Sequence, residues 1–600
     1  MHRQLIIIGV VLLYFAAPAL GAIIQVSDGC TIEDAINAAN TDSGQGGCPQ
    51  GSGSDTIVLP AGKFPISQGQ EITGDMRFIG QGQDNTIIDG QAEMGKSTYF
   101  IKVVRGTVSL SGLTIEGFKV PQDGFLAPLD VDEGSSLHLF DVTIRANDAS
   151  VGAILIRGYV SVVESNIRLN IASHATIYVA PTGHLFLTRS AVVENSSRPA
   201  RAHVVVKKDY ATLYGDGTMQ IRRSTISTNN IPRIRDVGGH GVGGIIANSS
   251  VQIFSSTIVF NQGRLTGGIR SLSGAEVTLQ NSILAKNLRT DLSISNCAGT
   301  LNSGDYNILD TALGFAEPCT IVGLTSHNIM EDPRLEDLLR PLGSNTVMHR
   351  PQFFDDDPAF SPAINGGPPD PPDIIDGDAC PFLDQRLLRR IDRCDIGAVE
   401  VGTALLVYNR AGNQPGDNHM KLHLHVDLAF KVFDDTLVGT PDTAGKNLVI
   451  ILESAPSAVA GQRFRNVPVP VLVIKPGAFD EMSMTGANPD DFGVSPNQTS
   501  VWIKTKRRMT ADLIGTVPTT FFPQRYAFGR KLAPGAKCLA RAHETSTRCM
   551  IFRIGAGKLL SNGMPAPARR VGFFAVGNTY RDVTSEGERL FLGAVLWAAR

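Results

Sequence analysis

The sequence is short of charge and of aromatic side chains. Charged residues make up 18% of the 600 positions, against about 25% in an average soluble domain, and aromatic residues make up only 6%. The formal net charge is −3, so there is no basic excess to predict nucleic-acid binding or a polybasic membrane tether. The chain has instead 42% apolar residues and 62 glycines. This balance excludes a disordered or fibrous chain and favours short strands joined by tight turns.

The first residues predict export. His2 and Arg3 form a short basic segment, Leu5 to Phe15 is an apolar run, and Ala19-Leu20-Gly21 offers small residues for cleavage. This order is typical of a signal peptide over residues 1–21. The apolar run is too short for an ordinary membrane span, although a retained N-terminal anchor is the alternative. We therefore expect a secreted protein, extracellular or periplasmic, with no membrane span after cleavage.

Cysteines are also few, and they fall into four pairs of sequence neighbours. Disulfides persist outside the cytosol, so an exported chain is expected to use them. Eight cysteines allow about 105 connectivities, which makes neighbour pairing a hypothesis. The spacings match no zinc site, so these residues are interpreted as staples and not as metal ligands. The expected disulfides are Cys30–Cys48, Cys297–Cys319, Cys380–Cys394 and Cys538–Cys549.

A repeat predicts the fold of the first two thirds of the chain. A pattern recurs in units that begin at Val108, Leu137, Val160, Leu185, Met219, Val251 and Val277: an apolar residue, another two positions on, a third position five on, an aliphatic residue seven on and usually an asparagine ten on. The first unit lacks the asparagine, and the third position is usually serine. The alternation indicates two strands separated by a bend, and a third strand precedes most units. Three strands per coil predict an all-β right-handed parallel β-helix. A leucine-rich repeat competes at this period, but its leucine spacing and amphipathic helix are missing.

The asparagines at the tenth position are expected to stack from coil to coil. Their side-chain amides can donate and accept hydrogen bonds along the axis, and asparagine tolerates the left-handed backbone of a tight turn. The predicted ladder consists of Asn147, Asn170, Asn195, Asn229, Asn261 and Asn287.

Both ends of the solenoid resemble known segments. The stretch from Cys30-Thr-Ile-Glu-Asp-Ala-Ile to Cys48-Pro resembles the CSLREA-type segment that opens many exported bacterial β-helix proteins. The stretch from Asp332-Pro-Arg-Leu to Cys394-Asp-Ile-Gly-Ala resembles the closing segment of choice-of-anchor Q proteins. These resemblances imply one capped, pectin-lyase-like β-helix over residues 22–402, with the amphipathic stretch Ile32 to Ala39 as its N-terminal plug.

A second, smaller domain is expected over residues 403–600. Apolar strands at Ala404–Val407, Lys431–Phe433, Leu448–Leu452 and Val469–Ile474 alternate with a candidate helix at Asp417–Val426, which indicates a parallel α/β sheet. Stretches such as Gly445-Lys-Asn-Leu-Val-Ile-Ile-Leu-Glu-Ser resemble glutamine-amidotransferase-like, flavodoxin-like domains.

That resemblance implies a catalytic cysteine after Leu452, but the sequence there is Glu453-Ser-Ala-Pro-Ser. We therefore expect an inactive relative, with Ser454 only a remote candidate nucleophile. His419, His423 and His425 lack the HExxH pattern of a metal site and are interpreted as a solvated helix face.

The solenoid offers a better candidate site. Two coils carry about eight extra residues, at 208–217 and at 230–243, and these inserts are expected to wall a groove on the face of the first strand of each coil. If Ile154, Ile177, Val204 and Ile269 point inward, their polar neighbours point into that groove. The candidate ligand-binding residues are Arg157, Tyr178, His203, Lys207, Asn248 and Arg270, and Asp130 and Asp132 are weak candidate metal ligands.

These residue types suit a sugar chain. Arginine and lysine pair with uronate carboxylates, and tyrosine can stack on a sugar ring. The first hypothesis is a secreted or surface-displayed, non-catalytic protein that binds a polymeric carbohydrate or another surface, with no cofactor. The alternative is a polysaccharide lyase or glycoside hydrolase acting on an acidic polysaccharide, in which case Ca²⁺ would assist elimination. A structural stalk without a ligand is a third, weaker hypothesis.

Overall fold

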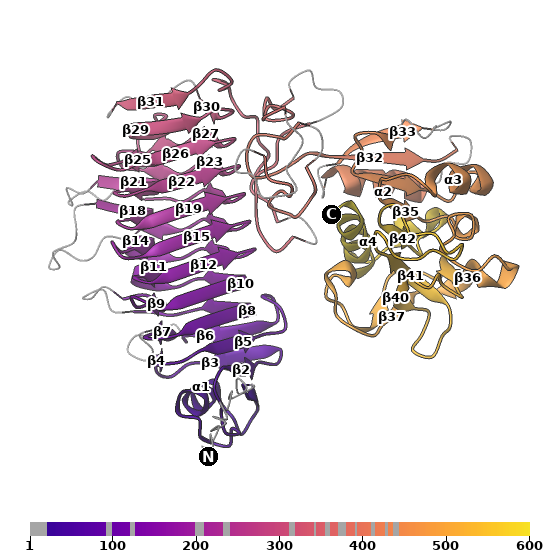
Figure 1. The fold of residues 1–600 in the computed structure, drawn as a ribbon, viewed down its shortest axis with the longest axis horizontal. Helices are drawn as coiled ribbons and strands as arrows, with labels where there is room; N and C mark the ends of the chain where they lie inside the picture. The colour runs from indigo at the N-terminus through magenta and orange to yellow at the C-terminus, as the bar shows by residue number, and fades with distance from the viewer. Residues whose placement is uncertain are drawn as a thin grey trace, which may run out of the picture.

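The structure is a computed structural model in which a long solenoid and a smaller α/β domain lie side by side (Figure 1). It describes residues 21–91, 99–120, 126–197, 209–231, 240–310, 318–340, 344–353, 360–369, 380–390, 393–409, 415–426, 430–435 and 443–600. The predicted signal peptide therefore lies almost entirely outside the described residues. Helices in the described part of the chain are too short or too polar to cross a membrane.

In its described residues the solenoid is a parallel β-helix of 31 strands, of which 29 belong to one continuous hydrogen-bonded sheet and β24 and β28 pair separately. Its first sheet contains β4 (Gln70–Ile72), β7 (Ile101–Val103), β9 (Leu129–Val131), β11 (Asp148–Ile156), β14 (Ile171–Val179), β18 (Asp209–Gly215), β21 (His240–Ala247), β25 (Ile269–Ser271) and the start of β29 (Cys297–Gly304). Short strands β17 (Ser196–Ser197), β24 (Gln262–Gly263) and β28 (Leu288–Arg289) precede this sheet in three coils.

The second and third sheets carry the repeated units. The second contains β1 (Ile23–Gln25), β2 (Asp55–Val58), β5 (Met76–Ile79), β8 (Thr107–Glu116), β10 (Ser136–Arg145), β12 (Tyr159–Val163), β15 (His184–Thr188), β19 (Thr218–Arg222), β22 (Val251–Phe254), β26 (Val277–Gln280) and β31 (Cys319–Leu324). The third contains β3 (Gly62–Pro65), β6 (Thr86–Asp89), the ends of β8 and β10, β13 (Asn166–Arg168), β16 (Ala191–Val193), β20 (Thr225–Ser227), β23 (Thr257–Val259), β27 (Ile283–Ala285) and β30 (Ile308–Leu309). The predicted parallel β-helix is confirmed.

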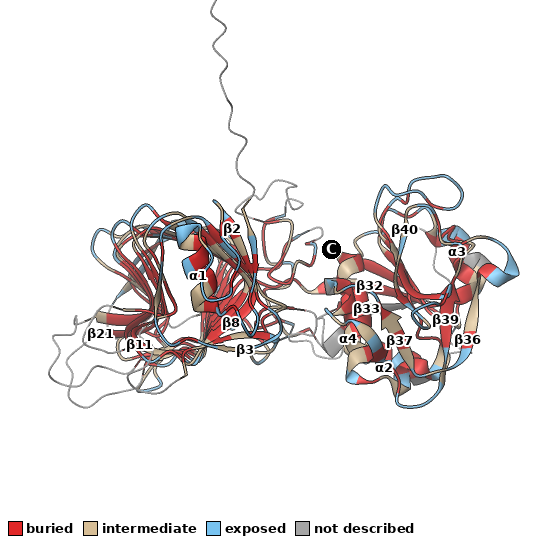
Figure 2. Cartoon of the chain, turned by 90° about the horizontal axis from the view of Figure 1, so that it is seen from below, coloured by how far each residue is buried: buried red, intermediate tan, exposed pale blue. Residues whose placement is uncertain are grey.

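Aliphatic side chains fill the inside of the coils, and Figure 2 shows buried residues concentrated there. At the N-terminal end, helix α1 (Ile32–Thr41) places Ile32, Ala35 and Ile36 against this core. The hydroxyl of Thr31 caps the helix by accepting a hydrogen bond from the Asp34 N–H. The first turn of the solenoid is thus closed by an amphipathic helix.

Two ladders of buried polar side chains follow the bends. In the first, each asparagine Nδ2 donates to the Oδ1 of the next coil at 2.8–3.0 Å, from Asn147 through Asn170, Asn195, Asn229 and Asn261 to Asn287. The left-handed backbone expected at these asparagines lies instead one residue earlier, for example at Ala146 (φ 54°) and Leu169 (φ 56°). The reason is that each asparagine N–H must itself point along the axis toward the next Oδ1.

The second ladder, made of serines, was not predicted. The backbone N–H of Ser165, Ser190, Ser224 and Ser256 each donates to the hydroxyl of the serine in the next coil, at 3.1–3.2 Å. Ser282 ends the ladder by donating its N–H to Asn307. The repeat contained these serines, but periodicity alone does not distinguish a buried hydroxyl from an exposed one.

The closing segment, defined as residues 380–402, joins the two domains. Gln385 donates to the Thr346 hydroxyl and the Val347 carbonyl and accepts from Thr225 of β20, so this segment is fixed to the third sheet. Leu388 packs in the core of the α/β domain, and Asn447 of that domain donates to the Arg389 carbonyl at 2.7 Å. The four expected disulfides are all formed.

The α/β domain has an 11-stranded mixed sheet. Its parallel part contains β32 (Gly402–Val407), β33 (Phe430–Asp435), β34 (Leu448–Ile451), β35 (Val471–Val473) and β42 (Arg570–Gly572), in the spatial order β33-β32-β34-β35-β42. Helices α2 (Pro415–Val426), α3 (Ser457–Phe464) and α4 (Ser585–Ala599) accompany it. The predicted strands and helix of this part are present.

An antiparallel extension of this sheet was not predicted. It contains β36 (Phe492–Gln498), β37 (Ser500–Ile503), β38 (Gly515–Pro518), β39 (Gln524–Gly529), β40 (Ala536–Arg541) and β41 (Cys549–Ile554).

Candidate functional site

The outer face of the first sheet carries a row of polar and aromatic side chains. Paired positions on successive strands are Lys102, Asp130, Leu155, Tyr178, Tyr214, Ile246 and Arg270. Their neighbours Ile154, Ile177 and Ile269 are fully buried inside the coils, as predicted. The row runs along the solenoid axis, one residue per coil, and we name it the first-sheet row.

One part of the predicted groove is corrected. Residues 208–217 were expected to be an insert after a strand around Val204, but residues 209–215 form strand β18, in which Leu213 pairs with Ile177. The sequence contains two alternating apolar stretches in this coil, and alternation alone does not show which one joins the sheet. In the next coil, β21 already begins at His240, inside the expected insert 230–243. His203 and Lys207 lie outside the described residues.

Arg157 lies beside the row, at its most highly charged part. Its Nη1 lies 2.6 Å from Asp130 Oδ1 and 3.2 Å from Asp132 Oδ1, and Lys102 Nζ lies 3.1 Å from Asp132 Oδ2. Burial raises the pKa of Asp130, although the Arg157 charge favours its ionised form. The two aspartates proposed as metal ligands therefore neutralise two cations instead. Within the described ranges, no three His, Cys, Asp or Glu side chains come close enough to hold a metal ion.

Tyr178 lies at the centre of a second cluster. Its hydroxyl donates to Asp216 Oδ2 at 2.5 Å, and the other oxygen of Asp216 accepts from Asn248 Nδ2 at 2.9 Å. The rings of Tyr178 and Tyr214 lie 5.7 Å apart, and His174 packs against both at about 5 Å. Tyr178 is only 6% exposed, so its ring has little free face for stacking on a sugar.

Electrostatics keep both phenols protonated. Burial and the Asp216 hydrogen bond raise the pKa of Tyr178 above its usual range. Burial, with smaller effects from Asp216 and Asp209, raises the pKa of Tyr214 to about 12. At neutral pH these groups are hydrogen-bond donors and not bases. Arg270 lies 3.5 Å from Asp209, so this cation also faces a carboxylate.

Sequence reasoning thus named part of each cluster. It found Arg157 with Asp130 and Asp132, and Tyr178 with Asn248, but it missed the side chains that link or extend them. Those residues are Lys102, His174, Asp209, Tyr214 and Asp216. Asp209, Tyr214 and Asp216 belong to the coil whose strand was predicted at the wrong position. The alternation Asp-Tyr-Ala-Thr-Leu-Tyr at 209–214 could have indicated the correct strand.

The α/β domain has polar groups where its parallel strands end. Ser454, after β34, accepts a hydrogen bond from the Asn409 N–H at 3.2 Å, so its hydroxyl acts as a structural acceptor there. Lys475 Nζ donates to the Glu453 carbonyl at 2.6 Å. His423 is 2.5 Å from Glu588 and packs on Tyr580, which differs from the solvated face expected for the histidines. His419 is exposed, and the side chain of His425 lies outside the described residues.

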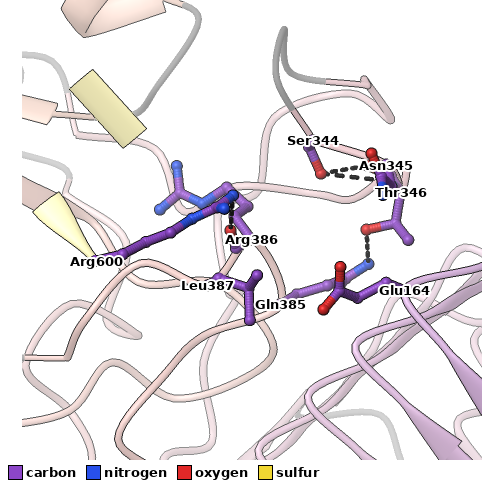
Figure 3. Close-up of a pocket in the computed structure, with 8 residues that line it drawn as sticks. All are labelled: Glu164, Ser344, Asn345, Thr346, Gln385, Arg386, Leu387 and Arg600. Atoms are coloured by element: carbon purple, nitrogen blue, oxygen red, sulfur yellow. Dashed lines mark hydrogen bonds between the residues drawn. The ribbon is translucent and has the colours of Figure 1, made fainter. Parts of the chain in front are cut away.

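A small polar cavity lies between the closing segment and the solenoid (Figure 3). It is lined by Glu164, Ser344, Asn345, Thr346, Gln385, Arg386, Leu387 and Arg600. Its volume of about 10 Å³ leaves room for about one water molecule, so it is part of the packing and not a ligand site.

Comparisons with known proteins do not identify a family for this chain. No protein-family model matches the chain, and neither does any curated protein. Among solved structures, a mutant of the PL6 family alginate lyase AlyGC matches at 10% sequence identity over 76% of this chain and 68% of that chain. Its TM-score is 0.15, so this likeness carries no argument. The strand pairings show a parallel β-helix joined to an α/β domain, and the chain contains four disulfides.

Proposed function

We propose that this protein is exported and that its solenoid binds a polymeric carbohydrate without cleaving it. The observation that carries the proposal is the first-sheet row, in which Lys102, Asp130, Tyr178, Tyr214 and Arg270 occupy paired positions along one face, interrupted by the buried Leu155 and Ile246. Neighbouring parallel strands lie ~4.8 Å apart, so the row repeats along the axis in the way that a polymer repeats along its chain. Charged and phenolic donors suit hydroxyl and carboxylate groups.

Three features favour binding over catalysis. Arg157 is fixed by two carboxylates, Arg270 faces a third, and the two phenols are protonated at neutral pH. Elimination or hydrolysis needs a group that accepts a proton at the substrate. The arginines are cations and the phenols keep their protons at neutral pH, so these four groups do not accept a proton from a substrate.

Lyase or hydrolase activity on an acidic polysaccharide is the second candidate. The observation that favours it is the proximity of Asp130 and Asp132 to Arg157 and Lys102, since acidic substrates need cations. As an enzyme, the protein would act on the same face, where Arg157 and Lys102 would exchange an aspartate partner for a substrate carboxylate.

The remaining assignments are part of the same proposal. Residues 1–21 are a signal peptide, residues 22–402 the capped β-helix and residues 403–600 a flavodoxin-like domain. The spatial order of its parallel strands, 2-1-3-4-5, supports that fold. Both cysteines of the domain form the Cys538–Cys549 disulfide, which supports an inactive relative of the amidotransferases. Four disulfides support export.

The test compares two arginines of similar exposure. Arg157→Ala removes the arginine that pairs with Asp130 of the row, whereas Arg168→Ala removes an arginine that pairs with Glu194 on the third sheet. Purified mature protein is titrated with polygalacturonate, alginate and chondroitin sulfate, with Ca²⁺ or with EDTA. We expect binding to at least one polymer, at least about tenfold weaker for Arg157→Ala and unchanged for Arg168→Ala. Equal binding by both variants would remove the first-sheet row as the site.

A further inference from the structure

The outer face of the second sheet carries a different row of rings. His138 of β10, Tyr159 of β12 and Phe186 of β15 follow one another with ring centroids 5.8 and 6.5 Å apart. Arg222 of β19 continues the row, with its guanidinium 6.0 Å from the Phe186 centroid and 5.3 Å from that of Phe254 on β22. These contacts connect five consecutive coils, whose strands are stacked in Figure 1.

Part of this aromatic surface is open to solvent. Phe186 is 37% exposed, and Phe140, which is in register with Arg222 along the sheet, is 44% exposed. In contrast, Tyr178 and Tyr214 on the first sheet are 6% and 5% exposed. Exposed rings gathered on one sheet face indicate a binding surface, because their burial would otherwise stabilise the fold.

The segments of this face between the bends carry charge of one sign, and the carboxylates Asp141 and Glu164 lie at the bends that follow. The second-sheet segments 107–111, 136–140, 159–163, 184–188, 218–222, 251–254 and 277–280 contain no aspartate or glutamate, and Arg222 is their charged residue. Apart from the rings and Val163, their other outward positions hold hydroxyls and amides, among them Ser161, Gln220 and Gln252, with the histidines His138 and His184. In a chain of net charge −3, such a face fits a partner that is itself negatively charged.

We propose that this aromatic surface is a second binding surface, for a linear polysaccharide that carries negative charges. Ring faces contact the apolar C–H faces of sugar rings, the flanking amides and hydroxyls bond to sugar hydroxyls, and Arg222 attracts the anionic groups. From His138 to Arg222 the row spans three strand spacings, about 14 Å, so it would contact several consecutive sugars. Phe254 is 7% exposed and packs under the Arg222 guanidinium. A protein partner would bury aromatic or arginine anchors in a pocket at the centre of the interface, whereas a sugar chain needs only exposed ring faces. This surface is separate from the first-sheet row, and the proposal stands even if that row binds nothing.

The experiment uses the full mature protein with two probes, polygalacturonate and the uncharged hydroxyethyl cellulose. The aromatic variant combines Tyr159→Ala with Phe186→Ala, and its control is Phe521→Ala, which removes a ring that is 69% exposed on the α/β domain. We expect the double variant to lose about tenfold or more in affinity for polygalacturonate, and the control to match wild type. Hydroxyethyl cellulose should bind more weakly than polygalacturonate to wild type.

A second variant guards against a folding defect. Ser161→Asp places a carboxylate between the rings at an outward, half-exposed position, so it should leave the thermal unfolding temperature unchanged. We expect it to weaken polygalacturonate binding more than hydroxyethyl cellulose binding. Wild-type affinity for polygalacturonate in both the double variant and Ser161→Asp would overturn the proposal, as would failure of wild type to bind polygalacturonate. Arg157→Ala, assayed in parallel, reports on the first-sheet row alone.

Discussion

The coils of the solenoid and the closing segment both bury polar groups, but they satisfy them in opposite ways. In the coils, neutral amides and hydroxyls repeat from coil to coil, so each Asn or Ser finds the same partner on the next coil. In the closing segment, ion pairs satisfy the buried polar groups: buried Arg386 pairs with Asp384, and buried Arg390 pairs with Glu400. Repetition lets a structure bury polar groups without charge, whereas a unique segment that joins two domains needs strong, directional partners.

The largest expected loss of stability comes from a substitution in the charged cluster of the closing segment. Arg390→Met removes hydrogen bonds to the Asp395 and Gly397 carbonyls and to Glu400 Oε2, and it leaves the Glu400 carboxylate buried without its cation. We expect a loss of about 3–5 kcal/mol, measured by chemical denaturation. The exposed Arg393, which bonds to the Gly367 carbonyl, provides the control Arg393→Met with a loss of less than about 1.5 kcal/mol. Equal losses would contradict the role given to the buried cluster.

A smaller loss of stability is expected from a substitution in the asparagine ladder. Asn229 accepts from the N–H and Nδ2 of Asn195 and donates to the Val192 carbonyl and to Asn261. Asn229→Ala leaves several of these groups unpaired, for an expected loss of about 3 kcal/mol. Hydrogen exchange should be faster in peptides that cover residues 190–200 and unchanged in the α/β domain. The exposed Asn302 gives the matched variant Asn302→Ala, for which we expect no change.

The pH dependence separates the two regions. Burial raises the pKa of Asp395 to about 6 and that of Glu400 well above its usual range. The folded state therefore binds more protons than the unfolded state between about pH 4 and 6, so this segment's contribution to stability is largest at low pH and falls as the pH rises through that window. Asp395→Asn should reduce this slope in unfolding curves taken from pH 4 to 7. An unchanged slope would contradict it, and Asn229→Ala should leave the slope intact.

The smallest expected effect compares the two ladders. The Ser224 hydroxyl accepts from the Ser190 N–H at 3.1 Å and donates to the Arg222 carbonyl at 2.8 Å. Ser224→Ala removes fewer bonds than Asn229→Ala, so we expect a loss of about 1 kcal/mol by the same denaturation assay. A loss as large as that of Asn229→Ala would mean that the serine ladder contributes as much as the asparagine ladder.

The same contrast explains how much could be predicted. The solenoid repeats, so seven similar units disclosed the strands, the bends and the asparagine column. The stretch around Val204 was predicted to be the strand, but the stretch around Leu213 is. Both stretches alternate, and only the pairing of Leu213 with Ile177 in three dimensions distinguishes them. The charge cluster of the closing segment and the contact of Tyr178 with Asp216 depend on residues far apart or in irregular chain, where no period exists. For the same reason, the sequence contains the aromatic residues of the second sheet but does not show that their rings contact one another on one face.

The central claim is that the solenoid binds a polymeric carbohydrate without cleaving it. The most direct test incubates the purified mature protein with polygalacturonate and alginate, with and without Ca²⁺, and measures binding and products in the same samples. The account predicts saturable binding to at least one polymer, with no new unsaturated ends by absorbance and no increase in reducing sugar. Product formation that requires Arg157 would contradict it and establish a lyase or hydrolase, and the absence of binding to any polymer would contradict it as well.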